Sequence, residues 1–254
     1  MSSESIKGSL ETSFQDTIAT IEFGHPASNS FPRQLLDRLT AEINLLSRDE
    51  NVSVIILKSE GVRAFCSGAS FDELLQVENE EQGTEFFSGF AHLLNAMRNC
   101  NKLIIGRVQG KAVGGGVGII AACDYVFATP ESDVKLSELA IGIGPFVIEP
   151  AVSRKVGKTA MTEMTLAANE WKSAEWASQK GLFSVVCESF SLDLKIDDFA
   201  KRLSSYNPEA LLQMKKIIWE GTEQWESLLF ERAAITGKLV LSDFTKNALL
   251  QFKK

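Results

Sequence analysis

The sequence predicts an α/β fold, and three observations lead to this prediction. Strand-like apolar segments alternate with helix-like segments over about the first 190 residues, as in chains that form parallel sheets with right-handed crossovers. Several strand-like segments, such as VSVIILKSEG at 52–61, are almost continuously apolar, which is typical of strands covered on both faces. From residue 197 onward, the remaining segments read as helices.

The clearest local signals lie near the start of the chain. Residues 17–24 alternate apolar and polar side chains, which predicts a strand. Residues 31–49 predict an amphipathic helix with apolar side chains on one face: Leu35, Leu36, Leu39, Ile43 and Leu46. Further strands are expected within 52–61, 102–110 and 125–130, and further helices over about 71–78, about 82–98 and after the glycines at 114–116.

Two regions are expected: a catalytic core over residues 1–196 and a helical region over 197–254. The helical region is rich in large apolar side chains, including Trp219 and Trp225. Such a region either packs on the core of its own chain or covers a subunit interface. Pro208 is expected to begin a helix, and Gly221 and Gly237 to mark breaks or close approaches.

Composition narrows the class of partner. The net charge of -7 makes nucleic acid an unexpected partner, because phosphate backbones are met by clustered Lys and Arg. The polar N-terminus lacks a signal-peptide profile, and no apolar run approaches the roughly 20 residues that span a bilayer. We therefore expect a cytoplasmic protein without membrane contact. The four cysteines and two histidines show no metal-ligand spacing, so no metal is expected.

Two glycine-centred segments could supply chemistry. In AFCSGASFDELL, Gly68 forms a turn before a helix, which can leave the amide of Ala69 without an acceptor. In GKAVGGGVGIIAACD, Gly114, Gly115 and Gly116 follow a strand and open a helix. Together, two such amides could stabilise an enolate or tetrahedral oxyanion. The segment has neither GxGxxG nor GK[ST], so nicotinamide and nucleoside triphosphate cofactors are not expected.

The order of three motifs resembles the crotonase superfamily of enoyl-CoA hydratases and isomerases. The motifs are F-x-S-G-A-S, G-x-A-x-GGG followed by A-A-C-D, and L-S-E-L-x-I-G-I-x-P, and the resemblance extends over essentially the whole chain. It implies a spiral of repeated ββα units with a helical C-terminal region that closes the site and supports assembly. It also implies an acyl-CoA substrate, no separate cofactor because coenzyme A is part of that substrate, and a homotrimer or dimer of trimers.

The resemblance also assigns residues. Ala69 and Gly115 correspond to the two amides that hold the thioester oxygen, and Glu138 corresponds to a catalytic glutamate. The positions expected to form or border the substrate and coenzyme A site are Asn29, Phe31, Ala64, Phe65, Ser67, Gly68, Gly114, Gly116, Pro145 and Phe146. Among them, Gly114 and Gly116 are expected to shape the turn that carries the Gly115 amide.

The chain departs from the hydratase pattern at Gly118, where a typical hydratase has its first glutamate. A single carboxylate suits isomerisation, because one base can remove a proton and return it elsewhere. The stretch SELAIGIGPFVIEPAVSRKVG, however, is similar to bacterial methylglutaconyl-CoA hydratases, and on that ground hydration of a 2-enoyl-CoA is preferred, with delta3,delta2-enoyl-CoA isomerisation as the alternative. Burial among apolar neighbours is expected to raise the pKa of Glu138.

Other readings stay open at this point. The missing glutamate also allows a catalytically weak homologue that binds coenzyme A, and the same oxyanion site could serve decarboxylation or thioester hydrolysis. Asp72, Glu73 and Glu149 fall near predicted helix starts, where an acidic residue needs no catalytic role. The sequence leaves the acyl chain unidentified, since the apolar positions that could line its pocket suit a helix core equally well: Phe86, Phe87, Phe90 and Phe146.

Overall fold

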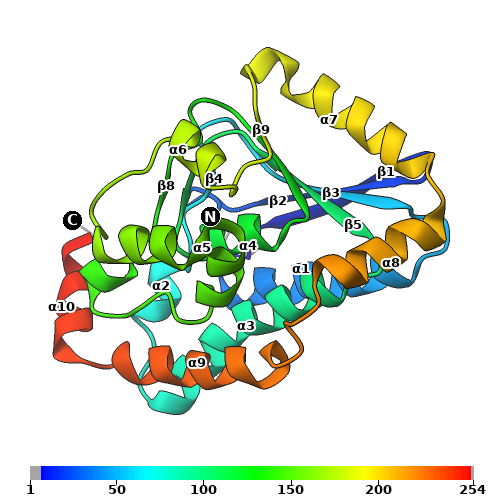
Figure 1. Cartoon of the computed structure of the whole chain (residues 1–254). Coiled ribbons are helices and arrows are strands. Elements are labelled where there is room, and N and C mark those ends of the chain that lie inside the picture. Colours follow the sequence, from blue (N-terminus) through cyan, green and yellow to red (C-terminus); the bar gives the residue numbers. More distant parts are fainter. Residues whose placement is uncertain (1–6, 253–254) are drawn as a thin grey trace.

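The computed structural model describes residues 7–252, which form two sheets surrounded by helices (Figure 1). The larger sheet has six strands in the order β1-β2-β3-β5-β7-β9. All neighbouring strands in it are parallel except β1 and β2. Its strands are β1 (Ser9–Gln15), β2 (Ile18–Gly24), β3 (Val54–Ser59), β5 (Leu103–Val108), β7 (Tyr125–Ala128) and β9 (Val185–Val186).

A smaller sheet carries the segments of most interest for function. It has three short parallel strands in the order β4-β6-β8. These are β4 (Ala64–Cys66), β6 (Lys111–Val113) and β8 (Val134–Lys135). Sequence reasoning did not separate this sheet, because strands of two or three residues are too short to show a period.

The helices divide between the two faces of the larger sheet. Helices α1 (Arg33–Arg48) and α3 (Glu80–Asn99) cover one face, and α7 (Ser189–Ser204) covers the other (Figure 1). Successive residues of β3 point to opposite sides, as the pleat of a strand requires: Ile55 and Leu57 join the core under α1 and α3, whereas Val54 and Ile56 pack with α7. The continuously apolar strands are therefore buried on both faces, as the sequence predicts.

The remaining helices are α2 (Phe71–Leu74), α4 (Gly115–Ala122), η1 (Glu138–Ile141), α5 (Glu149–Leu166), α6 (Ala174–Gln179), α8 (Pro208–Ile218), α9 (Trp225–Leu239) and α10 (Asp243–Phe252). None of the helices between residues 7 and 252 combines the length and apolar character needed to cross a membrane. The first six residues of the N-terminal segment lie outside the described residues.

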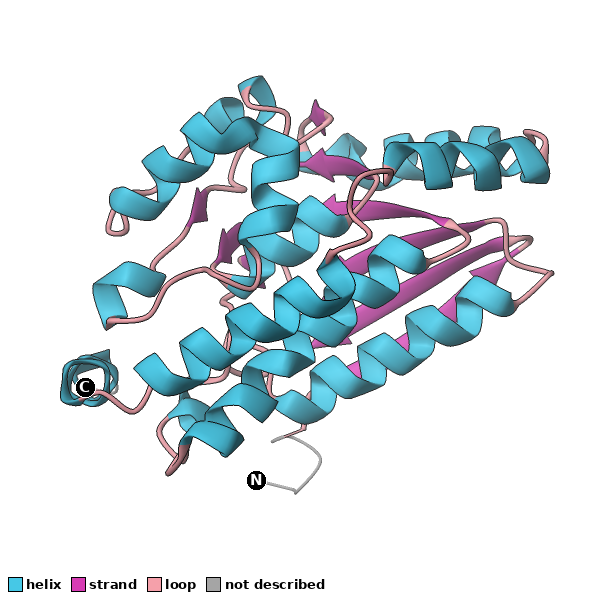
Figure 2. Cartoon of the chain, turned by 60° about the horizontal axis from the view of Figure 1, so that its bottom comes forward, coloured by secondary structure: helices cyan, strands magenta, loops and turns pink. Residues whose placement is uncertain are grey.

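The C-terminal helices pack on the core of the same chain. Figure 2 shows α9 lying alongside α3, and the two helices touch through their backbones at Gly83 and Gly237. A Cβ atom added to Gly83 would lie 2.6 Å from the carbonyl oxygen of Gly237. Trp219 and Trp225, which the sequence placed either in the core or at an interface, are both buried in the main core.

A buried ion pair fixes the start of this C-terminal region. Asp124 follows α4, and its carboxylate accepts hydrogen bonds from Lys215 Nζ at 2.6 Å, Trp219 Nε1 at 2.8 Å and the Ile104 amide at 2.7 Å. The Asp124 and Lys215 side chains are only 5% and 2% exposed. Asp124 therefore has a structural role, and its partners extend to a helix 91 residues further along the chain.

Candidate active site

The candidate site lies where the three strands of the smaller sheet end. Ala69 follows β4, Gly115 follows β6, and Glu138 follows β8, each within three residues of the strand. Because the strands are parallel neighbours, their carboxyl ends meet at one edge of the sheet. Ligands of open parallel sheets bind at that edge. Segments separated by about seventy residues in the sequence are brought together in this way.

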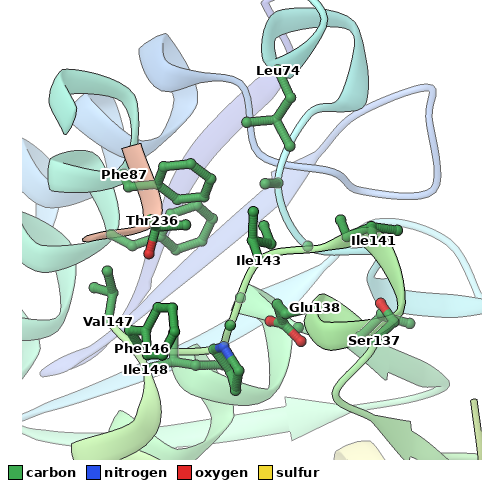
Figure 3. A pocket seen from close by; sticks show the side chains of 18 of the residues that line it. Leu74, Phe87, Ser137, Glu138, Ile141, Ile143, Phe146, Val147, Ile148 and Thr236 are labelled. Atoms are coloured by element: carbon green, nitrogen blue, oxygen red, sulfur yellow. The ribbon is translucent and has the colours of Figure 1, made fainter. Parts of the chain in front are cut away.

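A cavity of about 50 Å³ opens at this edge. Its lining is mostly apolar, and Glu138 is the one ionisable side chain among the lining residues that the structure describes. Figure 3 shows Phe87 and Thr236 on the side of the cavity opposite Glu138. The lining residues are Ser67, Gly68, Ala69, Phe71, Leu74, Phe87, Phe90, Val113, Gly114, Gly115, Ser137, Glu138, Ile141, Ile143, Gly144, Pro145, Phe146, Val147, Ile148 and Thr236.

The amides of Ala69 and Gly115 are available as a pair of hydrogen-bond donors. Ala69 bridges to Phe31 in a parallel register, and the bridge uses the Gly68 carbonyl and the Ser70 amide, so the Ala69 amide faces away from it. Gly115 is the first residue of α4, where a helix leaves its amides without an acceptor. Within residues 7–252, neither amide donates to a protein acceptor.

The two donors lie close to each other because the two glycine turns are in contact. A Cβ atom on Gly68 would lie 3.5 Å from the Gly115 nitrogen and 3.0 Å from the Val113 carbonyl oxygen. Gly68 has a φ of 89°, a backbone angle that residues other than glycine rarely adopt. The turn of Gly114, with φ 54° and ψ -120°, then directs the chain into α4. Behind the turns, the Gly68 amide donates to the Sγ atom of Cys66 at 3.3 Å.

Glu138 begins the short η1 helix, which ends at Gly142 with a φ of 84°. The residue as a whole is partly exposed, but its Oε2 atom is buried and has no hydrogen-bond partner among the described residues. Burial raises the pKa of Glu138 to about 7, although a hydrogen bond from its own main-chain amide offsets part of the rise. Near neutral pH this carboxyl group can therefore both accept and release a proton. This agrees with the raised pKa expected from the sequence.

Gly118, the position where the resemblance places the first glutamate of a typical hydratase, lies against an apolar side chain. A Cβ atom on Gly118 would lie 2.4 Å from Cγ2 and 2.6 Å from Cβ of Ile148. Because the Cβ atom of Ile148 is bonded directly to the main chain, rotation of the isoleucine side chain cannot remove this contact. No residue larger than glycine fits at position 118 without moving Ile148, so the cavity has an apolar wall at this point.

Comparison with known proteins decides the family. The model of the enoyl-CoA hydratase/isomerase family matches residues 13–247. This chain belongs to that family, within the crotonase superfamily. This chain is 28% identical over 235 residues to mitochondrial enoyl-CoA hydratase of Pongo abelii. The match covers 91% of this chain and 78% of that protein. The chain is also 28% identical over 200 residues to mitochondrial methylglutaconyl-CoA hydratase of Rattus norvegicus, covering 77% of this chain and 63% of that protein.

The fold agrees with this membership. A crystal structure of enoyl-CoA hydratase from Bacillus halodurans superposes on the chain with a TM-score of 0.87 at 21% identity, covering 95% of this chain and 99% of that one. The expected α/β crotonase-like fold with a helical C-terminal region is therefore confirmed. Family membership makes the chain an enzyme of the hydratase or isomerase type.

The structure brings most of the expected site residues of this hydratase/isomerase chain to one cavity. The cavity is lined by Ala69, Gly115, Glu138, Ser67, Gly68, Gly114, Pro145 and Phe146. The other expected positions do not line it: Asn29, Phe31, Ala64, Phe65 and Gly116.

Packing explains why these five positions lie elsewhere. Phe31 and Phe65 are fully buried, and their rings pack against Phe23. Asn29 has a φ of 56°, and its Nδ2 atom donates to the carbonyl oxygens of Glu60 and Ala64, so it shapes the loop. The Phe31 and Phe65 side chains thus belong to the core beneath the segments that the resemblance assigns to the border of the coenzyme A cleft.

Gly116 has a supporting place behind the cavity. A Cβ atom at this position would lie 2.7 Å from Cβ of Cys66, which packs the start of α4 against the end of β4. Gly116 therefore allows close packing of the two glycine segments, in keeping with the turn-shaping role that the resemblance implies.

The three acidic residues near helix starts lie outside the cavity lining. Glu149 is paired with Arg232 and accepts a hydrogen bond from Ser153 at 2.5 Å. Glu73 accepts a hydrogen bond from the Arg33 amide at 2.7 Å. These contacts stabilise helix ends, in keeping with the structural role considered for them. Asp72 lies on the exposed side of α2.

Sequence reasoning missed several contributors to the cavity, among them Ile148 and Thr236. Thr236 comes from α9, and Ile148 precedes α5. Neither residue belongs to a motif with a known chemical role, and both reach the site only through tertiary packing. Of the four phenylalanines considered for the acyl pocket, Phe86 does not line the cavity.

Proposed function

We propose that this chain moves a proton next to the carbonyl group of an acyl-coenzyme A thioester, with Glu138 as the single acid and base. In this proposal the thioester oxygen accepts hydrogen bonds from the amides of Ala69 and Gly115. Two such donors stabilise the negative charge that develops on the oxygen when the neighbouring carbon loses a proton. The residues flanking the Ala69 turn, including Ser67 and Gly68, would border the pantetheine portion of coenzyme A.

The reaction that the geometry supports best is the conversion of a 3-enoyl-CoA into a 2-enoyl-CoA. The Glu138 carboxylate removes a proton from C2, the electrons form a dienolate held at the oxyanion amides, and Glu138 returns the proton to C4. One group performs both transfers, which requires a pKa near neutrality. The observation that carries this choice is the packing of Ile148 against Gly118, which replaces a second carboxylate with an apolar surface.

Hydration of a 2-enoyl-CoA is the second candidate. The sequence favoured it over isomerisation, and relatives named as hydratases, including a methylglutaconyl-CoA hydratase, support it. In that reaction the oxygen of a water molecule bonds to C3 as a hydroxyl group, and one proton of that water is transferred to C2. Glu138 would have to orient the water, accept this proton and deliver it to C2. The apolar wall at Ile148 offers the water no second partner, which is why we rank hydration below isomerisation.

The test offers the purified protein one 3-enoyl-CoA and one 2-enoyl-CoA of equal length, such as the 3-hexenoyl and 2-hexenoyl thioesters. The proposal predicts 2-hexenoyl-CoA from the first and little 3-hydroxyhexanoyl-CoA from the second, as measured by mass spectrometry. When C2 of the 3-enoyl substrate carries deuterium, part of the label should appear at C4, because one shielded carboxyl group moves it. Rapid formation of the hydroxyacyl product, with no double-bond migration, would establish hydration instead.

Other properties expected from the sequence and from the resemblance remain proposals. These are assembly into trimers or dimers of trimers, the absence of a separate cofactor, a cytoplasmic location and the division into regions 1–196 and 197–254. The rival reading of a coenzyme A-binding homologue without turnover predicts thioester binding but no product from either substrate in the same assay.

A further inference from the structure

We propose that the acyl pocket accepts only short acyl chains without a charged end group, because Phe87, Phe90 and Thr236 close its far side. This inference rests on the acyl-CoA function proposed above and narrows its substrate class. Figure 3 shows Phe87 and Thr236 opposite Glu138, so a chain attached to a carbonyl near Glu138 would extend toward them.

The size of the cavity limits the chain. Its volume is about 50 Å³. A single water molecule needs roughly 10–15 Å³ measured in this way, so the cavity has room for roughly three to five atoms of that size. With the carbonyl carbon at the oxyanion amides, this room suits acyl groups of about four to six carbons.

The far side of the cavity is formed by buried side chains of two helices in close contact. Phe87 and Phe90 belong to α3, and Thr236 belongs to α9. One turn before Phe87, the two helices touch: a Cβ atom on Gly237 would lie 2.4 Å from the Thr84 nitrogen. All three side chains of the wall are buried, with exposed fractions of 6% or less. The wall is therefore a packed part of the core, not a mobile lid.

Phe90 links this wall to the oxyanion site. A Cβ atom on Gly115 would lie 2.3 Å from Cε1 of the Phe90 ring, so the ring lies directly against the start of α4. Movement of this ring to admit a longer chain would disturb the position of the Gly115 amide. The contact between Phe90 and Gly115 thus sets both the length of the acyl chain that the pocket admits and the geometry of the donor pair.

The charge of the cavity excludes an acidic end group. Glu138 is its one ionisable side chain among the described lining residues, and no cation faces it there. The Thr236 hydroxyl already donates to the Arg232 carbonyl oxygen at 3.1 Å. The guanidinium group of Arg232 binds Glu149 and the Phe146 carbonyl oxygen outside the cavity. A carboxylate on the acyl chain would therefore be buried near Glu138 without a compensating charge, which is strongly unfavourable.

Calorimetric titration with saturated thioesters tests the inference without turnover. The ligands are butyryl-, hexanoyl-, decanoyl- and glutaryl-CoA, with free coenzyme A as reference. We expect butyryl- and hexanoyl-CoA to bind at least tenfold more tightly than decanoyl- and glutaryl-CoA. Equal or tighter binding of decanoyl- or glutaryl-CoA would overturn the inference and leave the proposed function standing. Failure of every thioester and of coenzyme A to bind would overturn the proposed function as well.

Variants of Phe87, with Phe86→Ala as the matched control, test which side chain limits the length of the acyl chain. Phe87→Ala opens the wall and should tighten decanoyl-CoA binding at least tenfold, and the milder Phe87→Leu should give a smaller gain in the same direction. Phe86→Ala removes an equally buried ring from the same helix outside the cavity, so the chain-length profile should not change. The same gain in Phe86→Ala, or no gain in either Phe87 variant while both remain folded by circular dichroism, would contradict the role of the wall.

Discussion

The carboxyl group of Glu138 lies directly against Gly114, so that a Cβ atom on Gly114 would be 2.7 Å from Glu138 Oε1. The same glycine is the turn that precedes the Gly115 amide. The proposed base and one of the proposed oxyanion donors are therefore positioned by a single backbone contact. This contact explains how a site with one carboxylate can hold its acid–base group and its carbonyl-binding amides in register.

Gly114→Ala should disrupt this contact. The added methyl group meets Oε1 of Glu138, and the φ of 54° disfavours any L side chain. We expect at least a 100-fold loss in kcat/KM, measured with an enoyl-CoA substrate, since small displacements of catalytic groups cost this much. Gly61→Ala is the control, because Gly61 also has a positive φ but open space around it. Similar activity loss in both variants would mean that backbone strain alone is responsible.

The rate should depend on the ionisation of Glu138. Removal of a proton from C2 requires the carboxylate form, and burial raises the pKa of Glu138 to about 7. We therefore expect kcat/KM for a 3-enoyl-CoA to rise roughly tenfold per pH unit below pH 7 and to level off above it. A profile that is already flat from pH 5 upward would contradict the raised pKa.

The same group should make stability depend on pH. An acid whose pKa is raised from 4.5 to about 7 by folding stabilises the native state fully below pH 4.5, and this contribution is lost as pH rises through 7. Glu138→Gln lacks this loss. The free energy of unfolding of the variant minus that of the wild type should rise by about 2–3 kcal/mol between pH 4.5 and pH 8. Urea denaturation at the two pH values measures it, and a constant difference would refute the prediction.

The buried pair of Asp124 and Lys215 should dominate the attachment of α8. Lys215→Ala leaves a carboxylate buried without its cation, which should lower the free energy of unfolding by about 3–5 kcal/mol. Lys216→Ala, a neighbouring exposed position, should change it by less than about 0.5 kcal/mol. Thermal and urea unfolding compare the two variants. Equal effects would show that the ion pair contributes little.

The features that could be predicted from sequence are those with a local period or a local turn. All five apolar positions predicted for α1 are buried. The turns at Gly68 and Gly114 were identified because glycine is required there, and both have positive φ. These local signals, together with the motif order, were sufficient to identify the family and the residues at the three strand ends, but not much of the apolar cavity lining.

The features that were missed depend on partners far away in the chain. Strand β1 is polar and mostly exposed at a sheet edge, so it shows no apolar alternation. The first half of α7 was also missed, although it packs on the second face of the large sheet. No single-sequence signal links Gly118 to Ile148 or Gly83 to Gly237, because close packing between distant backbones leaves only a glycine as its trace.

The most direct test of the single-carboxylate account is the turnover of 3-hexenoyl-CoA by Glu138→Gln. The variant keeps the size of the side chain but removes its acid–base function. We expect a fall in kcat of about 100- to 10,000-fold, with affinity for hexanoyl-CoA retained. Turnover within about tenfold of the wild type would show that another group moves the proton, and would contradict the account.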